Sequence, residues 1–229
     1  LGGTPSRSSY FGFIDLAGFP KDTYYLYRSR WLPEEPTLHI LPHWNWPDRV
    51  GMTTPVHVFS NADAVELFIN GKSQGKIDSN PSTYRFMWND AVYEPGVVKA
   101  VGYKDGKVWS ESTLRTAGSA AKVVAEVDRA SIAADDRDLS FVTVSIEDKD
   151  GNPLPHADNL IQFSVTGPGE IIATGNGDQA SHTPFQSLER EAFSGLCLAI
   201  VRSTHESGSI TITAAAEGLE PANVTIQTR

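Results

Sequence analysis

The chain has 229 residues, enough for two domains of roughly 100 residues each, and its 40% hydrophobic and 21% charged composition is that of a globular protein. Its formal net charge of −9 argues against a nucleic-acid partner, because phosphate binding needs clustered lysine and arginine. A single cysteine, Cys197, excludes an intrachain disulfide and a cysteine-based zinc site, and no apolar run approaches the roughly 18 residues of a transmembrane helix.

The composition changes near residue 118. Residues 118–229 contain seven basic and sixteen acidic residues, so the whole excess of nine negative charges lies there. All five tryptophans and all seven tyrosines precede residue 118. Such a step at a stretch of small residues, Thr116–Ala121, is typical of a domain boundary. We therefore expect three parts: residues 1–35, 36–117 and 118–229.

Residues 1–35 predict one strand and one helix. Tyr10–Leu16 is a short apolar run typical of a buried strand, and Pro20 followed by Asp22 fits the start of a helix that Pro33 ends. A single strand and a single helix cannot bury their apolar faces alone, so this part is predicted to belong to a neighbouring α/β domain outside the chain. The aromatic stripe of the helix consists of Tyr24, Leu26, Tyr27 and Trp31.

From residue 37 to residue 114 every pattern predicts β-strands. Asn70-Gly71 lies between two strand-like runs and is the dipeptide most typical of a two-residue hairpin turn, and Asp105-Gly106 is a second one. About seven short strands with a turn every 8–12 residues are typical of an immunoglobulin-like β-sandwich, with Trp88 and Trp109 expected in its core. The strand patterns lie at residues 39–41, 56–59, 65–69, 75–77, 84–88, 97–103 and 108–109.

Residues 118–229 repeat the strand pattern without the tyrosines and tryptophans. Phe141–Ile146 alternates and runs into a turn at Asp150–Pro153. The predicted fold class is therefore mainly β: two immunoglobulin-like β-sandwiches in tandem, preceded by a strand and a helix. Further strand patterns lie at residues 122–128, 161–165, 170–173, 196–202, 209–214 and 223–226.

Catalytic and metal-binding patterns are weak. Asp135, Asp136 and Asp138 lie between strand patterns and are interpreted as a solvated turn. Asp148–Asn152 imitates the start of an EF-hand loop but lacks its helices and final glutamate, so it is a hairpin turn or a weak surface calcium site. Cys197 lies in an apolar run and is expected to be buried. We predict no catalytic residue, no metal and no cofactor.

The feature that best suits ligand contact is His43-Trp44-Asn45-Trp46, in a loop flanked by prolines. Two tryptophans one residue apart are costly to leave in water. Trp44 and Trp46 can stack on sugar rings, whose apolar faces suit aromatic platforms. They can equally pack on a neighbouring domain or close the end of the sandwich. The sequence leaves both alternatives open.

Three segments, in order along the chain, resemble one known family. Ser8–Asp22, with the aromatic residues up to Trp31, resembles the last strand and helix of the (β/α)8 barrel of family 2 glycoside hydrolases, nearest to the β-galactosidase-like members of Bacteroidetes-type bacteria. Ser60–Gly75 resembles the sandwich that follows this barrel. Segments within residues 138–178, among them Gly175-Asn176-Gly177-Asp178, resemble the next, bacterial immunoglobulin-like domain.

The resemblance implies a retaining glycosidase. In such enzymes one carboxylic acid protonates the leaving oxygen and a second carboxylate, about 5–5.5 Å away, is the nucleophile. In the family both glutamates come from earlier barrel strands, so both would lie upstream of Leu1. The chain alone is therefore predicted not to hydrolyse glycosides.

The resemblance also implies substrate-binding residues. In a whole barrel Ser8, Ser9 and Tyr10 would lie near the substrate, and the loop with Trp44 and Trp46 would reach over the face of the barrel or dock against its side. The β-glucuronidases of the family carry an Asn-x-Lys motif that grips the sugar carboxylate, whereas the corresponding residues 9–11 here are serine, tyrosine and phenylalanine. The missing cation favours a neutral sugar.

The resulting prediction is the non-catalytic C-terminal region of a periplasmic or secreted bacterial β-galactosidase-like enzyme of carbohydrate catabolism. Its partners would be the catalytic barrel of the same polypeptide, an oligosaccharide substrate through that enzyme, and a second copy in a homodimer, with no nucleic acid and no membrane span. The sandwiches would brace the barrel or mediate dimer contacts. The alternative is a free-standing carbohydrate-binding or adhesin-type module, in which residues 1–33 would be disordered or would cover a sandwich face.

Overall fold

The computed structural model describes residues 9–229, so Ser8, at the start of the segment that resembles a barrel strand, lies outside the described residues. Strands make up 48% of the described residues and helix 6%, which confirms the mainly β fold. The described chain divides into two units. One comprises residues 12–14 and 20–116, and the other comprises residues 117–229 together with residues 9–11 and 15–19.

The aromatic helix forms where the sequence predicts it. Helix α1 spans Asp22–Trp31 and begins two residues after Pro20, whose fixed φ suits a helix entry. The Asp22 carboxylate lies in the first turn, and Arg28 and Arg30 lie in the last turn. Both arrangements favour the helix dipole. A proline two positions beyond the end of α1 stops its continuation.

The buried strand predicted over Tyr10–Leu16 is wrong for this chain. Among the described residues this segment forms a single bridge, between Ile14 and Pro20, and the Phe11 side chain is 92% exposed. A buried parallel strand needs hydrogen-bonding neighbours on both sides. None of the strands described below pairs with this segment. The apolar run therefore lacks the neighbours that its composition suits.

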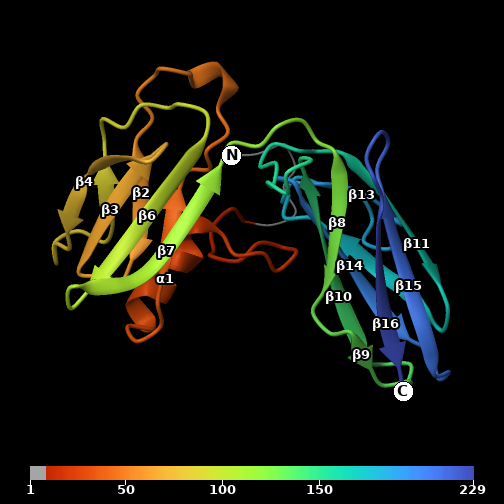
Figure 1. Ribbon diagram of the computed structural model, residues 1–229. Helices are drawn as coiled ribbons and strands as arrows, with labels where there is room; N and C mark the ends of the chain where they lie inside the picture. Colours follow the sequence, from red (N-terminus) through yellow and green to blue (C-terminus); the bar gives the residue numbers. More distant parts are fainter. Residues whose placement is uncertain (1–8) are drawn as a thin grey trace. The chain divides into compact units, whose positions relative to one another are not determined.

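The first β-sandwich follows α1 (Figure 1). Within the described residues it has a three-stranded sheet of order β1-β2-β5 and a four-stranded sheet of order β4-β3-β6-β7, with all pairs antiparallel. Val58 and Trp88 from the first sheet meet Leu67 and Val98 from the second in one buried core, and Trp109 packs against that core. The elements are β1 (Leu38–Leu41), the 3-10 helix η1 (Pro47–Arg49), β2 (Val56–Ser60), β3 (Ala64–Ile69), β4 (Lys72–Asp78), β5 (Phe86–Trp88), β6 (Val97–Lys104) and β7 (Lys107–Arg115).

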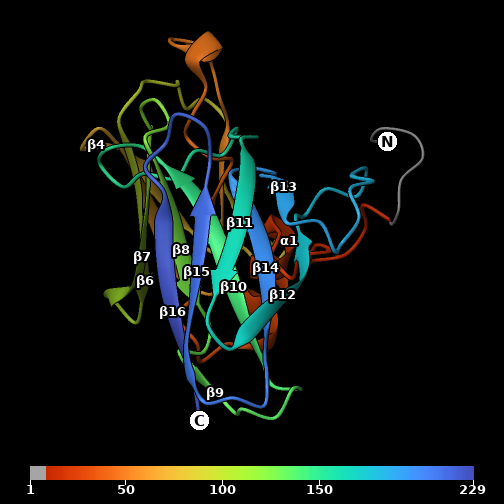
Figure 2. The same cartoon turned by 90° about the vertical axis from the view of Figure 1, so that its right-hand side faces the viewer.

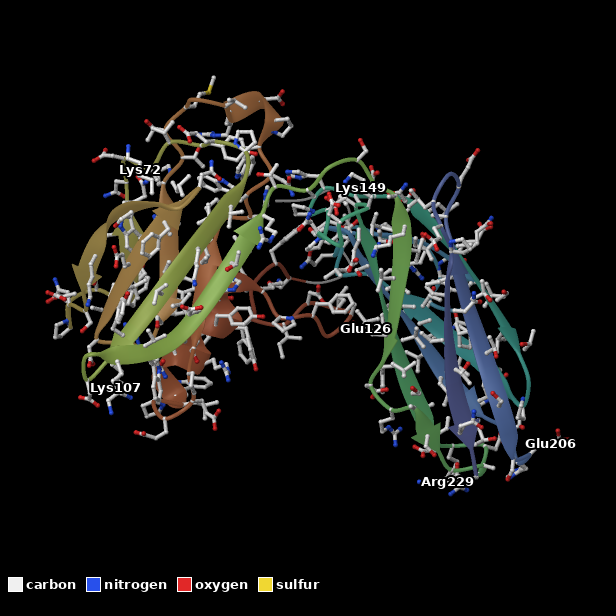
Figure 3. All side chains as sticks on the ribbon, in the orientation of Figure 1. Lys72, Lys107, Glu126, Lys149, Glu206 and Arg229 are labelled. Carbon is white, nitrogen blue, oxygen red and sulfur yellow. The ribbon has the colours of Figure 1, made fainter. Side chains whose placement is uncertain are left out.

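Two predicted hairpin turns shape the four-stranded sheet. Asn70-Gly71 joins β3 to β4 with φ values of 48° and 79°, and Asp105-Gly106 joins β6 to β7 with φ values of 51° and 73°. Positive φ at both central residues defines the type I′ turn, which matches the twist of a hairpin. Lys72 and Lys107, the first residues after the two turns, are exposed (Figure 3).

The second β-sandwich contains the strands labelled β8 to β16, seen from the side in Figure 2. Within the described residues its sheets have the orders β12-β14-β10-β8 and β13-β11-β15-β16-β9, and only the short β9–β16 pair is parallel. Cys197 is buried in the core as predicted, and burial raises the pKa of its thiol to about 12. The strands are β8 (Lys122–Val127), β9 (Ser131–Ile132), β10 (Leu139–Glu147), β11 (Leu160–Thr166), β12 (Gly169–Gly175), β13 (Glu189–Glu191), β14 (Leu196–Ser203), β15 (Gly208–Ala215) and β16 (Ala222–Thr228).

The segment that imitates an EF-hand start is a turn built on Asp148. This carboxylate accepts hydrogen bonds from the backbone N–H groups of Gly118, Asp150 and Asn152 at 2.8–2.9 Å, and from the Asn152 side-chain amide. These donors, the Asn152 amide above all, hold the pKa of Asp148 well below its ordinary value. Because N–H groups occupy the carboxylate that would start a calcium loop, the structure supports the hairpin-turn alternative. The neighbouring Lys149 is exposed (Figure 3).

Candidate functional site

One face of α1 displays aromatic side chains to solvent. We name Phe13, Tyr27, Trp31 and Leu32 the aromatic surface, because their exposed fractions are 38%, 42%, 67% and 48%. The Tyr27 ring lies 5.5 Å from the Phe13 ring and 4.9 Å from the Trp31 ring, measured between centroids. A contiguous patch of large apolar side chains marks an interaction surface.

The opposite face of α1 is fixed to the first sandwich. The Tyr25 ring stacks on the His39 imidazole of β1, with centroids 4.0 Å apart, and His39 Nε2 lies 2.7 Å from Asp22 Oδ1. Ser29 is buried, and the Arg28 guanidinium donates to two groups just before β1. The helix therefore covers part of the sandwich with one face and keeps the aromatic surface exposed on the other.

Asn61 fastens the end of α1. Its amide nitrogen donates to three backbone carbonyls within Leu32–Glu35, at 2.7–3.2 Å. Its amide oxygen accepts from the Thr37 backbone N–H and from Trp109 Nε1. One side chain thus fixes the connection between helix and sandwich, and with it the orientation of the aromatic surface. Sequence reasoning assigned no role to Asn61, since an asparagine after a strand has the pattern of an ordinary turn residue.

Trp44 closes the end of the first sandwich. Its ring is 1% exposed, lies edge-on to Tyr93 with centroids 4.9 Å apart, and donates from Nε1 to the Glu94 carbonyl at 2.9 Å. Both faces of this ring are covered by protein, so it has no surface on which a sugar could stack. The structure does not support the expected substrate contact of Trp44, and the packing alternative describes it.

The other predicted substrate-binding residues lie in different units. Trp46 is partly buried, stacks on His43 with centroids 4.2 Å apart, and donates from Nε1 to the His43 carbonyl. Ser9 and Tyr10 are exposed and belong to the unit that contains the second sandwich. The contact of Ser9, Tyr10 and Trp46 with a substrate stays a prediction.

The acidic cluster before β10 is a structural turn. The Asp138 carboxylate accepts from the backbone N–H groups of Ala133 and Leu139 and from Arg129, and these bonds lower the pKa of Asp138, with the Ala133 bond the largest cause. Asp135 accepts from the N–H of Asp138. Across residues 9–229 there is no group of three or more histidine, cysteine, aspartate and glutamate side chains placed to hold a metal ion. The described helices also include none of the length and apolarity that a bilayer crossing requires.

Each of the two sandwiches matches a known family model. Residues 123–225 match the model of the glycoside hydrolase family 2 C-terminal domain 5, which covers nearly all of the second sandwich. Residues 51–110 match a domain of unknown function, DUF4982, which covers most of the first sandwich.

Curated relatives and solved structures agree with these matches. A β-galactosidase of Bacteroides ovatus is 44% identical over 221 residues, which are 96% of this chain and 26% of that protein. A putative β-glucuronidase of Formosa agariphila is 34% identical over 223 residues, which are 94% of this chain and 21% of that protein. The crystal structure of a β-glycosidase from Bacteroides vulgatus matches with a TM-score of 0.94 and 34% identity, over 98% of this chain and 29% of that one.

Two sandwiches and a helix with an exposed aromatic face define a β-rich accessory region. The chain belongs to glycoside hydrolase family 2, as a C-terminal region of its enzymes. It spans about a quarter of the length of the curated relatives it matches.

Proposed function

We propose that this chain is the non-catalytic C-terminal region of a retaining, β-galactosidase-like glycoside hydrolase, and that it braces the catalytic barrel of the same polypeptide. The observation that carries the proposal is the aromatic surface of α1. The relatives that share nearly the whole chain are named as glycoside hydrolases and are about four times as long. A barrel belonging to the rest of such an enzyme supplies a partner of the right kind for this surface.

Burial of the aromatic surface gives the brace its strength. Trp31 is 67% exposed, and burying one large apolar side chain stabilises by about 1.5–3 kcal/mol. Because Asn61 and the Tyr25–His39 stack fix α1 to the sandwich, a barrel docked on the aromatic surface would be held by the whole sandwich. The helix is thus a connector with one face for each domain.

Catalysis is assigned to the absent part of the enzyme. The carboxylates of Asp138 and Asp148 accept backbone hydrogen bonds within turns, and Glu170 pairs with Arg202. None of these three has the arrangement of a retaining glycosidase, which needs one protonated and one ionised carboxyl about 5–5.5 Å apart. The purified chain is therefore expected not to release nitrophenol from nitrophenyl galactosides, and steady turnover with normal saturation would contradict the proposal.

The sugar is proposed to be a neutral galactoside. The supporting observations are the absence of a cation among residues 9–11 and the name of the Bacteroides ovatus relative. Ser9, Tyr10 and Trp46 stay candidates for substrate contact in the whole enzyme. The proposal includes the division into residues 1–35, 36–117 and 118–229. It also includes a periplasmic or secreted location, which cell fractionation would test, and a homodimer, which light scattering of the whole enzyme would test.

The brace is tested in the whole enzyme with Trp31→Ser. We expect a lower midpoint of thermal unfolding of the barrel and a lower specific activity, since a polar side chain would replace the most exposed ring of the docking surface. Val108→Ser on β7 is the matched control, because Val108 is 59% exposed and lies outside the aromatic surface. Equal stability and activity of Trp31→Ser, Val108→Ser and the unmodified enzyme would overturn the brace. The free-standing module is less well supported, since the buried Trp44 offers no sugar platform.

A further inference from the structure

The first sandwich has a polar hollow of about 380 Å³ beside the end of α1. Three segments line it: the end of α1 with Ser29, Arg30 and the following Pro33, the connection Ser60–Asp63 between β2 and β3, and residues of the segment Ser79–Phe86 that leads into β5. Its volume falls within the range of about 300–1,000 Å³ that is usual for small-ligand sites.

Two guanidinium groups in this hollow lack an acidic partner. Arg30 donates from Nη2 to the Thr83 carbonyl at the long distance of 3.4 Å, and Arg85 Nη1 lies 3.3 Å from His57 Nδ1. Neither arginine forms an ion pair with any carboxylate of the described chain. A guanidinium has five N–H donors, and each of these two groups has one hydrogen-bond partner within the described chain; the Arg85 guanidinium also lies 5.2 Å from the centroid of the Tyr84 ring.

Arg85 lies beside a histidine of β2. Burial first, and the positive charge of Arg85 second, lower the pKa of His57. The lowered pKa favours the neutral imidazole, which can accept a hydrogen bond from Arg85 Nη1. Two arginines that form no ion pair can supply the charge-assisted donors that planar or tetrahedral oxyanions accept.

The remaining lining suits a hydroxylated ring. Asn80, whose amide oxygen accepts the Ser82 N–H, and Ser79 both line the hollow. Asp63 also lines the hollow, and one of its carboxylate oxygens accepts the Asp105 N–H. The apolar part of the wall comes from Pro33, Pro81 and Phe86.

We propose that this hollow binds a saccharide unit carrying an anionic group, a uronate carboxylate or a sulfate ester. Arg30 and Arg85 hold the anion, and Ser79, Asn80 and Asp63 bind ring hydroxyls. Asn61 forms a rigid wall and takes no ligand, because its amide is already fully hydrogen-bonded within the chain. The inference is independent of the brace, since every residue it uses lies in the first sandwich unit.

The test is calorimetric titration of the purified 229-residue chain with glucuronate and with galactose 6-sulfate, and with galactose and inorganic sulfate as comparisons. We expect at least one anionic sugar to bind, with galactose and inorganic sulfate each at least about tenfold weaker, and we expect the affinity to fall as salt rises. Whichever of glucuronate and galactose 6-sulfate binds more tightly identifies the anionic group as a carboxylate or a sulfate.

Arginine variants test the residues. Arg30→Gln and Arg85→Gln should each weaken binding about tenfold or more, because each removes a charge-assisted hydrogen bond. Arg115→Gln is the matched control, since Arg115 is exposed at the end of β7 and does not line the hollow. Thermal melts check that each variant is folded. Arg30 is exposed, so its variant should melt normally.

Amide NMR tests the same proposal without any substitution. In amide NMR spectra of the unmodified chain, the ligand should shift the signals of Ser79, Asn80 and Thr83. The proposal is overturned by the absence of binding of both anionic sugars, by equal affinity of the two variants and the control, or by shifts confined to other residues. Inorganic sulfate binding as tightly as galactose 6-sulfate would also overturn it, because it would show an anion site without sugar recognition.

Discussion

The Tyr25 ring lies parallel to the His39 imidazole, with 6° between the two planes and 4.0 Å between the centroids. Tyr25 comes from the middle of α1 and His39 from β1, so this stack joins the helix to the first sandwich. The neighbouring residue pair, Asp22 and His39, is 2.7 Å apart between Oδ1 and Nε2. His39 therefore contacts two residues of α1, Asp22 and Tyr25.

The Tyr25–His39 stack should contribute measurably to stability. In a double-mutant cycle with Tyr25→Ala and His39→Ala, the coupling free energy is expected to be about 0.5–1.5 kcal/mol, the range of aromatic pairs. Urea unfolding of the two single variants and the double variant measures it. A cycle of Tyr24→Ala with His39→Ala is the control. Additive losses in the Tyr25 cycle would show that the stack does not anchor α1.

Asp148 should make the second sandwich sensitive to acid. Its folded-state pKa lies below the ordinary value of 3.8, so the folded chain keeps this carboxylate ionised at pH values where the unfolded chain takes up a proton. The stabilisation is therefore complete above about pH 5 and is lost as the pH falls through 3.8 toward the lowered pKa.

The measurement is the pH dependence of the unfolding midpoint for Asp148→Asn. This variant should be less stable at pH 7 and should lose less further stability on acidification than the unmodified chain. Asp150→Asn provides the control, because Asp150 is exposed and pairs only with its neighbour Lys149 among the described contacts of its side chain. Parallel pH profiles for Asp148→Asn and the unmodified chain would refute the assignment.

Arg190 should hold the loop between β12 and β13. Its guanidinium is buried and donates to the carbonyls of Thr174, Thr183 and Pro184 at 2.7–3.2 Å. Arg190→Gln is expected to cost about 1.5–3 kcal/mol, the range for hydrogen bonds to a charged group, and to raise amide exchange across residues 176–188. Arg202→Gln, which loses only an exposed pair with Glu170, should change little. Unchanged exchange in the loop would contradict this role.

Local chemistry explains what the sequence predicted well. The hairpin at Asn70-Gly71 follows from two residues that tolerate positive φ, and α1 follows from Pro20 and the acidic first turn. Both are decided within a few residues of the chain. The sequence could also place Trp88 in the core, because the alternation of its strand sets which face is buried.

Long-range contacts explain what the sequence missed. The Asn61 side chain is hydrogen-bonded to the segment Leu32–Glu35 and to Trp109, which lie 26 or more positions away in the sequence. Nothing near Asn61 in the sequence therefore indicates its role. The Arg30–Arg85 hollow depends in the same way on segments 55 residues apart in sequence. The strand predicted at Tyr10–Leu16 failed because none of the described strands pairs with this segment, and pairing depends on partners that local composition does not show.

Substitution of Trp44 should lower the stability of the chain strongly, whereas substitution of Trp31 should hardly change it. Trp44→Ala removes a 1% exposed ring from the end of the sandwich, and is expected to destabilise the chain by about 3–5 kcal/mol. Trp31→Ser changes a 67% exposed ring, and should leave the stability of the isolated chain almost unchanged. Denaturant unfolding of both variants, followed by circular dichroism, makes the comparison. A large loss for Trp31→Ser would mean that its ring serves the fold of this chain, and the aromatic surface would then no longer stand as a surface reserved for the barrel.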